Sequence, residues 1–287
     1  MAAHDINLPY VPTWCTGCGD FGILSALKKA ITTLNLDLEQ TVLATGIGCS
    51  SKIAQYVNTY RIETLHGRSL PVATGIKLAN HNLTVIAEGG DGDGMGLGLG
   101  HFIHTARRNL DITYFIHNNQ IYGLTKGQAS PTSDLGVITK FTPAPLGNLE
   151  QPINIVQTAL NAGATFVARA FVANSTQLAD LMAEAIRHPG FAVIDILQPC
   201  VSFNLINTYQ WYQQRVKPIE TMEGYNPNDL TAALSLARLW GEQIPVGVFY
   251  RKIRPTFNGS LTQLAHEPLA EQEIASIDIS NLMRKLC

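Results

Sequence analysis

The length, composition and charge of this chain exclude several classes of protein. It has 287 residues, of which 46% are hydrophobic and 15% charged, and its formal net charge is −2. Such a balance is typical of a globular protein and gives no electrostatic basis for binding nucleic acid or an anionic membrane. We expect no secretory signal, because the N-terminus lacks a basic region followed by an apolar core. We also expect no membrane span, because no apolar run reaches about 18 residues.

The cysteine content gives information about the compartment. The chain has an odd number of cysteines, at Cys15, Cys18, Cys49, Cys200 and Cys287. An odd number in a chain without an export signal argues against a disulfide framework. We therefore expect a cytoplasmic protein, in which clustered cysteines bind metal or do redox work.

The apolar pattern predicts alternating helices and strands over the first two thirds of the chain. In chain order these are a helix at 21–35, a strand at 41–48, a helix at 69–82, a strand at 83–88, a helix at 96–109, a strand at 112–118, a helix at 153–163, a strand at 165–171, a helix at 175–188 capped by Ser175, and a strand at 191–197. Beyond residue 200 the pattern weakens. The stretches TYQWYQQRVKP and GEQIPVGVFYRKIRP read as arms and short turns, and residues 271–286 read as a terminal helix.

This order predicts an α/β fold with a doubly wound, mostly parallel sheet. The strands are nearly continuous apolar runs, as expected for a parallel sheet covered on both faces. We divide the chain into an N-terminal arm with cysteines (1–20), a ligand-binding domain (21–200), and a C-terminal extension (201–287) that packs on the core or on a partner. Ligands gather at the carboxyl ends of parallel strands, where the loops GIGCSSK, GGDGDG, NNQIYG and QPC all fall.

The stretch EGGDGDGMGLGLGH (88–101) has glycine at every second position from Gly90 to Gly100. Glycine lets the main chain approach a ligand closely, and a strand–glycine–helix junction presents backbone N–H groups to phosphate. Gly90–Asp91–Gly92 is followed, after 25 residues, by Asn118–Asn119. A carboxylate and an amide oxygen at one sheet edge suit Mg²⁺. The two motifs together predict a bound diphosphate with Mg²⁺ rather than a structural turn.

Four cysteines form a second constellation. Cys15 and Cys18 form a C-x-x-C pair, Cys49 lies in GIGCSSK, and Cys200 follows a proline. The spacing alone fits structural zinc and a [4Fe–4S] cluster equally well, and inert core thiols remain a third interpretation. A redox C-x-x-C would not explain Cys49 and Cys200. Cys49 falls at the same sheet edge as the expected diphosphate, which favours iron–sulfur.

With these motifs in hand, the chain resembles the β subunit of the 2-oxoacid:ferredoxin oxidoreductases, a family of thiamine diphosphate enzymes. The resemblance covers about residues 10–200 and is carried by WCTGCGDFG, GIGCSS, LHGRSLPVATGIKLAN, GGDGDGMGLGLGH, ARRNLDITYFIHNNQIYGLTKGQASPTS and Pro199–Cys200. It implies an enzyme that cleaves a 2-oxoacid oxidatively with coenzyme A. The products are acyl-CoA, CO₂ and two electrons for ferredoxin, and the reaction is reversible.

The resemblance also implies the residues that bind the cofactors. Asp91, the Asn119 side chain and the Ile121 carbonyl would hold Mg²⁺, and the four cysteines (Cys15, Cys18, Cys49, Cys200) would hold the [4Fe–4S] cluster. The remaining thiamine diphosphate contacts would come from Gly48, Ser51, His66, Gly90, Gly92, Asp93, Gly123, Leu124 and Thr125.

Five residues are candidates for a role near the reacting groups. His66 and Arg68 lie at a strand-to-helix junction, where a solvated turn is the simpler interpretation. Lys52 could steer a substrate carboxylate, or it could be a surface lysine. Leu124 could pack on the thiazolium ring or belong to the core. Lys126 adds a cation where many family members read YGMTGGQ and this chain reads YGLTKGQ.

Three histidines, His101, His104 and His117, fit neither a nucleophile–base pair nor a metal constellation. We expect them to be packing or surface residues.

The expected partners are an α subunit that carries the pyrimidine-binding domain, ferredoxin and a small 2-oxoacid, in an αβ unit that pairs again to (αβ)₂. The cations Lys52, Arg68 and Lys126 favour 2-oxoglutarate, because a second carboxylate needs a charge partner. Pyruvate or a broad range of 2-oxoacids is the alternative. Two other hypotheses stay open: a non-redox thiamine diphosphate lyase or synthase with structural zinc, and a non-catalytic electron-transfer or assembly subunit.

Overall fold

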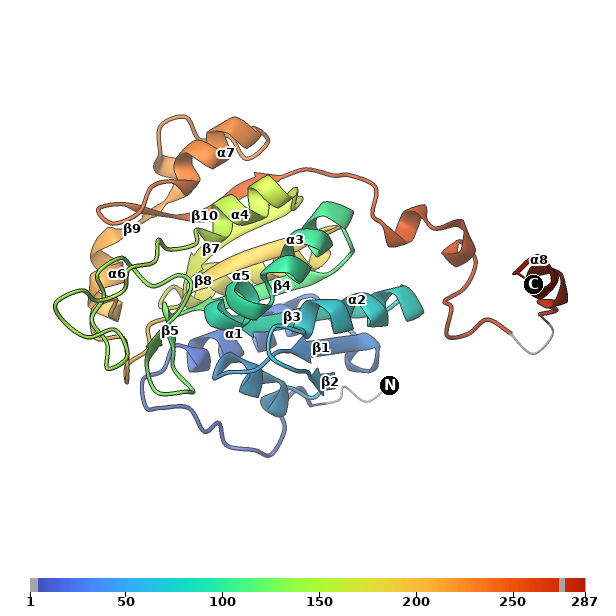
Figure 1. The fold of residues 1–287 in the computed structure, drawn as a ribbon, viewed down its shortest axis with the longest axis horizontal. Coiled ribbons are helices and arrows are strands. Elements are labelled where there is room, and N and C mark those ends of the chain that lie inside the picture. The colour runs from blue at the N-terminus through green and yellow to red at the C-terminus, as the bar shows by residue number, and fades with distance from the viewer. Residues whose placement is uncertain (1–4, 274–276, 287) are drawn as a thin grey trace.

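The computed structural model describes residues 5–273 and 277–286. Its centre is an eight-stranded sheet with helices on both faces (Figure 1). The strand order is β2-β1-β3-β4-β8-β7-β10-β9. The strands are β1 (Thr41–Thr45), β2 (Tyr60–Glu63), β3 (Thr84–Gly90), β4 (Thr113–Asn118), β7 (Phe166–Phe171), β8 (Ala192–Leu197), β9 (Val216–Pro218) and β10 (Ile244–Arg251). All neighbouring pairs are parallel except β7 and β10. The predicted fold class is confirmed.

The helices divide between the two faces. α1 (Asp20–Thr33) and α5 (Ser175–Arg187) cover one face, and α2 (Ser69–Ala79), α3 (Leu99–Arg108), α4 (Ile155–Ala162) and α7 (Leu230–Ala237) cover the other. α6 (Tyr209–Arg215) packs beside the first group, and α8 (Ser280–Leu286) lies at the end of an arm that leaves the body (Figure 1). None of the helices in the described part of the chain is both long and apolar enough to cross a bilayer.

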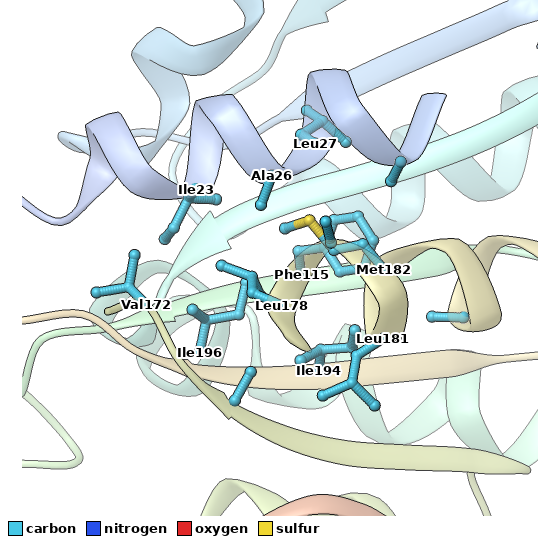
Figure 2. Close-up of a cluster of buried hydrophobic side chains, with 14 of the residues drawn as sticks. Ile23, Ala26, Leu27, Phe115, Val172, Leu178, Leu181, Met182, Ile194 and Ile196 are labelled. Atoms are coloured by element: carbon cyan, nitrogen blue, oxygen red, sulfur yellow. The ribbon is translucent and has the colours of Figure 1, made fainter. Parts of the chain in front are cut away.

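The core under α1 shows why these sequences form these elements. Ile23 and Leu27 recur at helical spacing on α1 and meet Leu178 of α5 (Figure 2). Phe115 and Ile194 reach the same cluster from β4 and β8. Each such side chain is completely buried, which stabilises the fold by about 1.5–3 kcal/mol apiece. Strands β4, β7 and β8 are buried over their whole lengths, which explains why their sequences are nearly continuous apolar runs. Arg169 of β7 and Asp195 of β8 interrupt these runs and pair with each other at 2.8 Å.

The structure corrects three local predictions. Asn174, not Ser175, caps α5, with its side chain accepting from the Gln177 amide at 3.3 Å. Residues 244–251, expected to be turns, form β10 inside the sheet. The helix predicted from residue 96 follows a π-helical segment, η3 (Gly92–Leu97).

Two further predictions concern the C-terminal helix and the division of the chain into parts. The terminal helix predicted over 271–286 is shorter, since α8 begins at Ser280, and Cys287 lies outside the described residues. The division of the chain at residues 20 and 200 stays a prediction, although β10 joins the sheet from beyond residue 200.

The polar loops meet where the parallel strands end. β1, β3, β4 and β8 are adjacent, and their carboxyl ends lead into Gly46–Ser50, Asp91–Asp93, Asn119–Gly123 and Gln198–Cys200. A short hairpin of β5 (Ile121–Tyr122) and β6 (Gln128–Ala129) follows β4. The predicted gathering of ligand loops at this edge is therefore observed.

Candidate functional site

Two adjoining cavities occupy the carboxyl edge of the sheet. The first, called here the glycine cavity, has a volume of about 80 Å³ and is lined by Ile47–Ser50, His66, Gly90–Asp93, His117, Asn119 and Ile121–Thr125. The second, the cysteine cavity, has a volume of about 210 Å³ and is lined by Thr13–Cys15, Cys18, Cys49, Lys52, Asn119, Gly123, Leu124, Lys126, Gln198 and Cys200–Phe203. Cys49, Asn119, Gly123 and Leu124 line both cavities, so one thin wall separates them.

Asp91 is the best-placed carboxylate for a cation in the glycine cavity. Its Oδ2 accepts hydrogen bonds from Ser130 Oγ at 2.5 Å and Thr132 Oγ1 at 2.6 Å. Burial raises the pKa of Asp91 to about 6, although these bonds favour the ionised form. Asn119 and Ile121 line the same cavity, and carboxylate, amide and carbonyl oxygens are the donors that Mg²⁺ prefers. The donor set thus fits the predicted metal.

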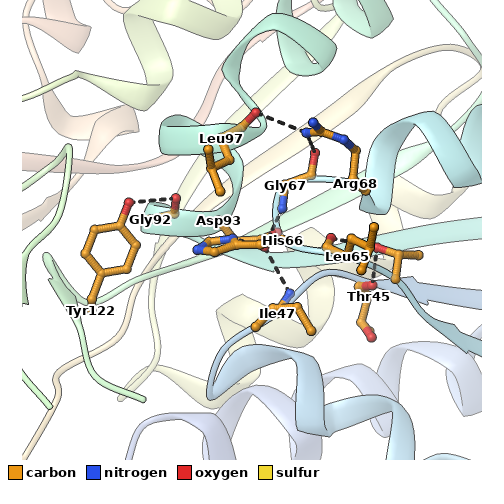
Figure 3. Close-up of polar contacts among 11 residues, drawn as sticks. Thr45, Ile47, Leu65, His66, Gly67, Arg68, Gly92, Asp93, Leu97 and Tyr122 are labelled. Atoms are coloured by element: carbon orange, nitrogen blue, oxygen red, sulfur yellow. Dashed lines mark hydrogen bonds and ion pairs between the residues drawn. The ribbon is translucent and has the colours of Figure 1, made fainter. Parts of the chain in front are cut away.

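Asp93 connects three loops around the glycine cavity (Figure 3). Its Oδ1 accepts from the Ile47 amide at 2.9 Å and the Gly67 amide at 2.8 Å. His66 Nδ1 lies 2.7 Å from the same oxygen. The fit is tight, because a Cβ at Gly46 would lie 2.0 Å from Asp93 Oδ2. Asp93 therefore holds the loops that form the walls of the glycine cavity.

The remaining lining of the glycine cavity fits a diphosphate. Ser50 Oγ is buried without a hydrogen-bond partner, so it has a donor to offer. Gly48, Gly90, Gly92 and Gly123 contribute backbone rather than side chains, which leaves room for phosphate oxygens. The volume accommodates about six water-sized groups, enough for the diphosphate end of a coenzyme but not for all of it.

The four candidate cysteine ligands all line the cysteine cavity. Burial, followed by the charge of Asp20, raises the pKa of Cys18 and brings that of Cys49 to about 11. Within residues 5–273 and 277–286, no three His, Cys, Asp or Glu side chains are close enough to share one metal ion. Four thiols around one cavity are a donor set that fits a [4Fe–4S] cluster, which binds four thiolates through separate irons.

The structure separates the five candidates for a role near the reacting groups. Lys52, Leu124 and Lys126 line the cysteine cavity, and His66 lines the glycine cavity. Arg68 does not join them: its guanidinium donates to the carbonyls of Gly67 and Leu97, outside the lining of both cavities (Figure 3).

Of two further residues predicted to contact the cofactor, Thr125 and Ser51, only Thr125 lines the glycine cavity. Thr125 lines the glycine cavity and donates to Gln128. Ser51 is buried with an unpartnered Oγ, but it is its neighbour Ser50 that lines the cavity.

Several residues at the site were missed by the sequence reasoning. Ser130 and Thr132 hold Asp91, and the hydroxyl-rich run SPTS was the available signal. Gln198 donates to Cys18 Sγ at 3.2 Å, and Trp14 donates to the Cys49 carbonyl at 2.7 Å.

We expected His117 to be a packing or surface residue, but it is a buried residue that makes polar contacts. It is buried between two carboxylates and lines the glycine cavity. His101 and His104 are partly or fully exposed on α3, as expected.

Comparison with known proteins identifies the family. Residues 46–196 match the family described as thiamine pyrophosphate enzyme, C-terminal TPP binding domain, and residues 200–266 match the family of C-terminal regions of the pyruvate ferredoxin oxidoreductase beta subunit. The chain is 48% identical over 260 residues to 2-oxoacid:ferredoxin oxidoreductase 1, subunit beta, of Aeropyrum pernix, covering 87% of this chain and 81% of the relative. It is 35% identical over 264 residues to 2-oxoglutarate synthase subunit KorB of Archaeoglobus fulgidus, covering 91% and 93%.

A solved structure is similar over nearly the whole chain. The 2-oxoglutarate:ferredoxin oxidoreductase from Magnetococcus marinus, with 2-oxoglutarate, coenzyme A and succinyl-CoA bound, superposes with a TM-score of 0.89 at 38% identity, covering 99% of this chain and 95% of that one. Sequence, domain matches and fold agree. The chain therefore belongs to the β subunits of the 2-oxoacid:ferredoxin oxidoreductases, which are enzymes that carry a thiamine pyrophosphate-binding domain.

Proposed function

We propose that this chain is the subunit that binds thiamine diphosphate, Mg²⁺ and a [4Fe–4S] cluster in an enzyme that oxidatively decarboxylates 2-oxoglutarate. One observation carries the proposal: the glycine cavity and the cysteine cavity share a wall that includes Cys49 and Leu124. A coenzyme in the first cavity and a cluster in the second would lie within short electron-transfer range. A structural zinc site would gain nothing from that proximity.

In this proposal the residues of the glycine cavity hold and orient the coenzyme. Asp91, Asn119 and the Ile121 carbonyl bind Mg²⁺, which neutralises the diphosphate. Ser50 and the glycine backbone bind the phosphate oxygens. When bound, thiamine diphosphate supplies the nucleophilic carbon and the electron sink for decarboxylation.

The overall reaction balances in atoms and electrons. A 2-oxoacid, CoA-SH and two oxidised ferredoxins give acyl-CoA, CO₂, two reduced ferredoxins and one proton. The C–C bond to the carboxylate breaks and the new C–S bond forms. A [4Fe–4S] cluster held by the four cysteines would supply a one-electron carrier. The reaction can run in either direction, and its reverse is a reductive carboxylation of the acyl-CoA.

The size of the glycine cavity supports the need for a partner subunit. Its volume of about 80 Å³ suits the diphosphate end of the coenzyme, and we infer that another protein surface encloses the aminopyrimidine end. An α subunit with the pyrimidine-binding domain would supply that surface and the activating glutamate. We infer an αβ unit that pairs to (αβ)₂, donates electrons to ferredoxin and works in the cytoplasm.

Two lysines support 2-oxoglutarate as the substrate. Lys52 and Lys126 both line the cysteine cavity next to Leu124, where they could bind a second carboxylate. Arg68 does not support this inference, because it lines neither cavity. The names of the relatives from Archaeoglobus fulgidus and Magnetococcus marinus point to the same substrate. Pyruvate remains the competing substrate.

The test is the specificity of the anaerobically reconstituted αβ complex. We expect a higher kcat/KM for 2-oxoglutarate than for pyruvate. Lys52→Ala and Lys126→Ala should each lower kcat/KM for 2-oxoglutarate by about 10- to 100-fold, because a charge-assisted hydrogen bond contributes about 1.5–3 kcal/mol. The effect on pyruvate should be smaller. Lys217→Ala, at an exposed position on β9, is the control and should change neither.

A higher kcat/KM for pyruvate, or equal losses with both substrates, would contradict the substrate assignment. Metal and acid-labile sulfide analysis of the same complex tests the cofactors separately. Zinc in place of iron and sulfide would favour the non-redox lyase or synthase.

A further inference from the structure

A buried ion-pair network lies between the two cavities and has no role in the assignments above. His117 Nδ1 is 2.7 Å from Asp20 Oδ1, and His117 Nε2 is 2.5 Å from Glu88 Oε2. None of the three side chains is more than 1% exposed. They come from α1, β4 and β3, so the network joins the first helix to the two strands whose loops line the glycine cavity.

The geometry defines the charge of the central ring. A carboxylate only accepts hydrogen bonds, and an imidazole donates from both nitrogens only when it is protonated. Two contacts to carboxylates therefore require an imidazolium. The network thus places one positive charge between two acidic side chains.

The network extends to the cysteines through Asp20. Its second oxygen, Oδ2, lies 3.4 Å from Cys18 Sγ. At the other end, the His117 ring lines the glycine cavity. The network is therefore in contact with both cofactor sites.

We propose that Asp20 lowers the reduction potential of the cluster held by the four cysteines, and that His117 positions Asp20 and partly offsets its charge. The inference rests on the proposed function, since it requires that cluster. Reduction adds an electron to the cluster, and a negative charge in a poorly solvated site disfavours that step. The imidazolium has the opposite effect. Both residues act on the potential through the Asp20–Cys18 contact.

The experiment is an EPR-monitored redox titration of the reconstituted αβ complex at pH 7. Asp20→Asn keeps the side-chain size and removes the charge, so the cluster potential should shift upwards. His117→Gln removes the positive charge but keeps an amide donor for Asp20, so the potential should shift downwards. Asp229→Asn is the matched control: this exposed side chain caps α7, and asparagine caps equally well, so the potential should not move.

The opposite signs distinguish the proposal from a general loosening of the structure. A change that merely let water reach the cluster would shift both variants in the same direction, and that result would overturn the inference. An unchanged potential in Asp20→Asn would overturn it too. If Asp20→Asn assembles no cluster, the direction of the His117→Gln shift decides. A native complex with no [4Fe–4S] signal would instead refute the proposed function, so the two failures remain distinguishable.

Discussion

The role of Asp93 gives the most informative prediction about the glycine cavity. The side chain is 2% exposed, and its Oδ1 accepts from the amides of Ile47 and Gly67 while it contacts His66. An anionic carboxylate repels a diphosphate, so we expect Asp93 to act by holding the loops rather than by binding phosphate directly. Asp93→Ala and Asp93→Asn separate these two effects, because asparagine keeps the acceptor oxygen and loses the charge.

The expected loss of stability follows from the three contacts that the Asp93 carboxylate makes. Removing one partner from a buried charged network costs about 3–5 kcal/mol, so we expect the free energy of unfolding to fall by about 4 kcal/mol in Asp93→Ala. A charge-assisted hydrogen bond is about 1 kcal/mol stronger than a neutral one. Asp93→Asn should therefore cost about 1–2 kcal/mol, since the exchange also removes the cost of burying a charge.

Amide hydrogen exchange of the complex without cofactors measures the effect at the bonds themselves. A local loss of about 3 kcal/mol would speed exchange at Ile47 and Gly67 by about 150-fold in Asp93→Ala, and a loss of 1–2 kcal/mol by about 5- to 30-fold in Asp93→Asn. The Gly98 amide is an internal control, because it bonds to the backbone carbonyl of Asp93 at 2.9 Å and should change little in Asp93→Asn. Unchanged exchange at Ile47 and Gly67 in both variants would refute the reasoning.

Two further predictions address packing and pH. Gly92→Ala would place a Cβ 2.1 Å from the Tyr122 ring, and this overpacking should lower the free energy of unfolding by about 1–3 kcal/mol. The double variant with Tyr122→Leu should recover part of the lost stability. A double variant that recovers none of it would contradict the steric cause. Burial lowers the pKa of His188, despite the opposing charge of Asp111, and its Nε2 lies 2.9 Å from Thr165 Oγ1. The unfolded chain therefore binds this proton at a higher pH, so stability should fall as the pH drops below about 6.5. In urea unfolding at pH 7.5 and 5.5, His188→Gln should show a smaller fall, and an equal fall would exclude His188 as its source.

The sheet was predictable because its strands are buried on both faces. Nearly continuous apolar sequences at β4, β7 and β8 distinguish these strands from the amphipathic helices between them. β10 was missed because IPVGVFYR contains a proline and a glycine, both unfavourable in strands. Gly247 has φ +134° and its Cβ would lie 2.6 Å from Ile219, so the glycine is required by a close approach. Tertiary packing thus overrides local propensity at this strand.

The site was predictable where a motif places a group next to a strand end, and less so where the group acts through a distant contact. Asp91 and Asn119 follow β3 and β4 directly, so the topology alone brings them to one edge. The Asp20–His117 contact joins residues 97 positions apart, and nothing local to HNN or CGD marks it. Arg68 shows the reverse error, since its sequence position near His66 suggested a substrate contact although Arg68 lines neither cavity.

The loop after β1 couples the two cavities mechanically. Gly48 and Ser50 line the glycine cavity, Lys52 lines the cysteine cavity, and Cys49 between them lines both. Trp14 fixes this loop by donating to the Cys49 carbonyl, and Asp93 fixes it again at the Ile47 amide. A displacement of Cys49 therefore cannot change one cavity without changing the other. Under the proposed function, these same few residues would position both the coenzyme and the electron acceptor, so the electron-transfer distance would depend on this loop.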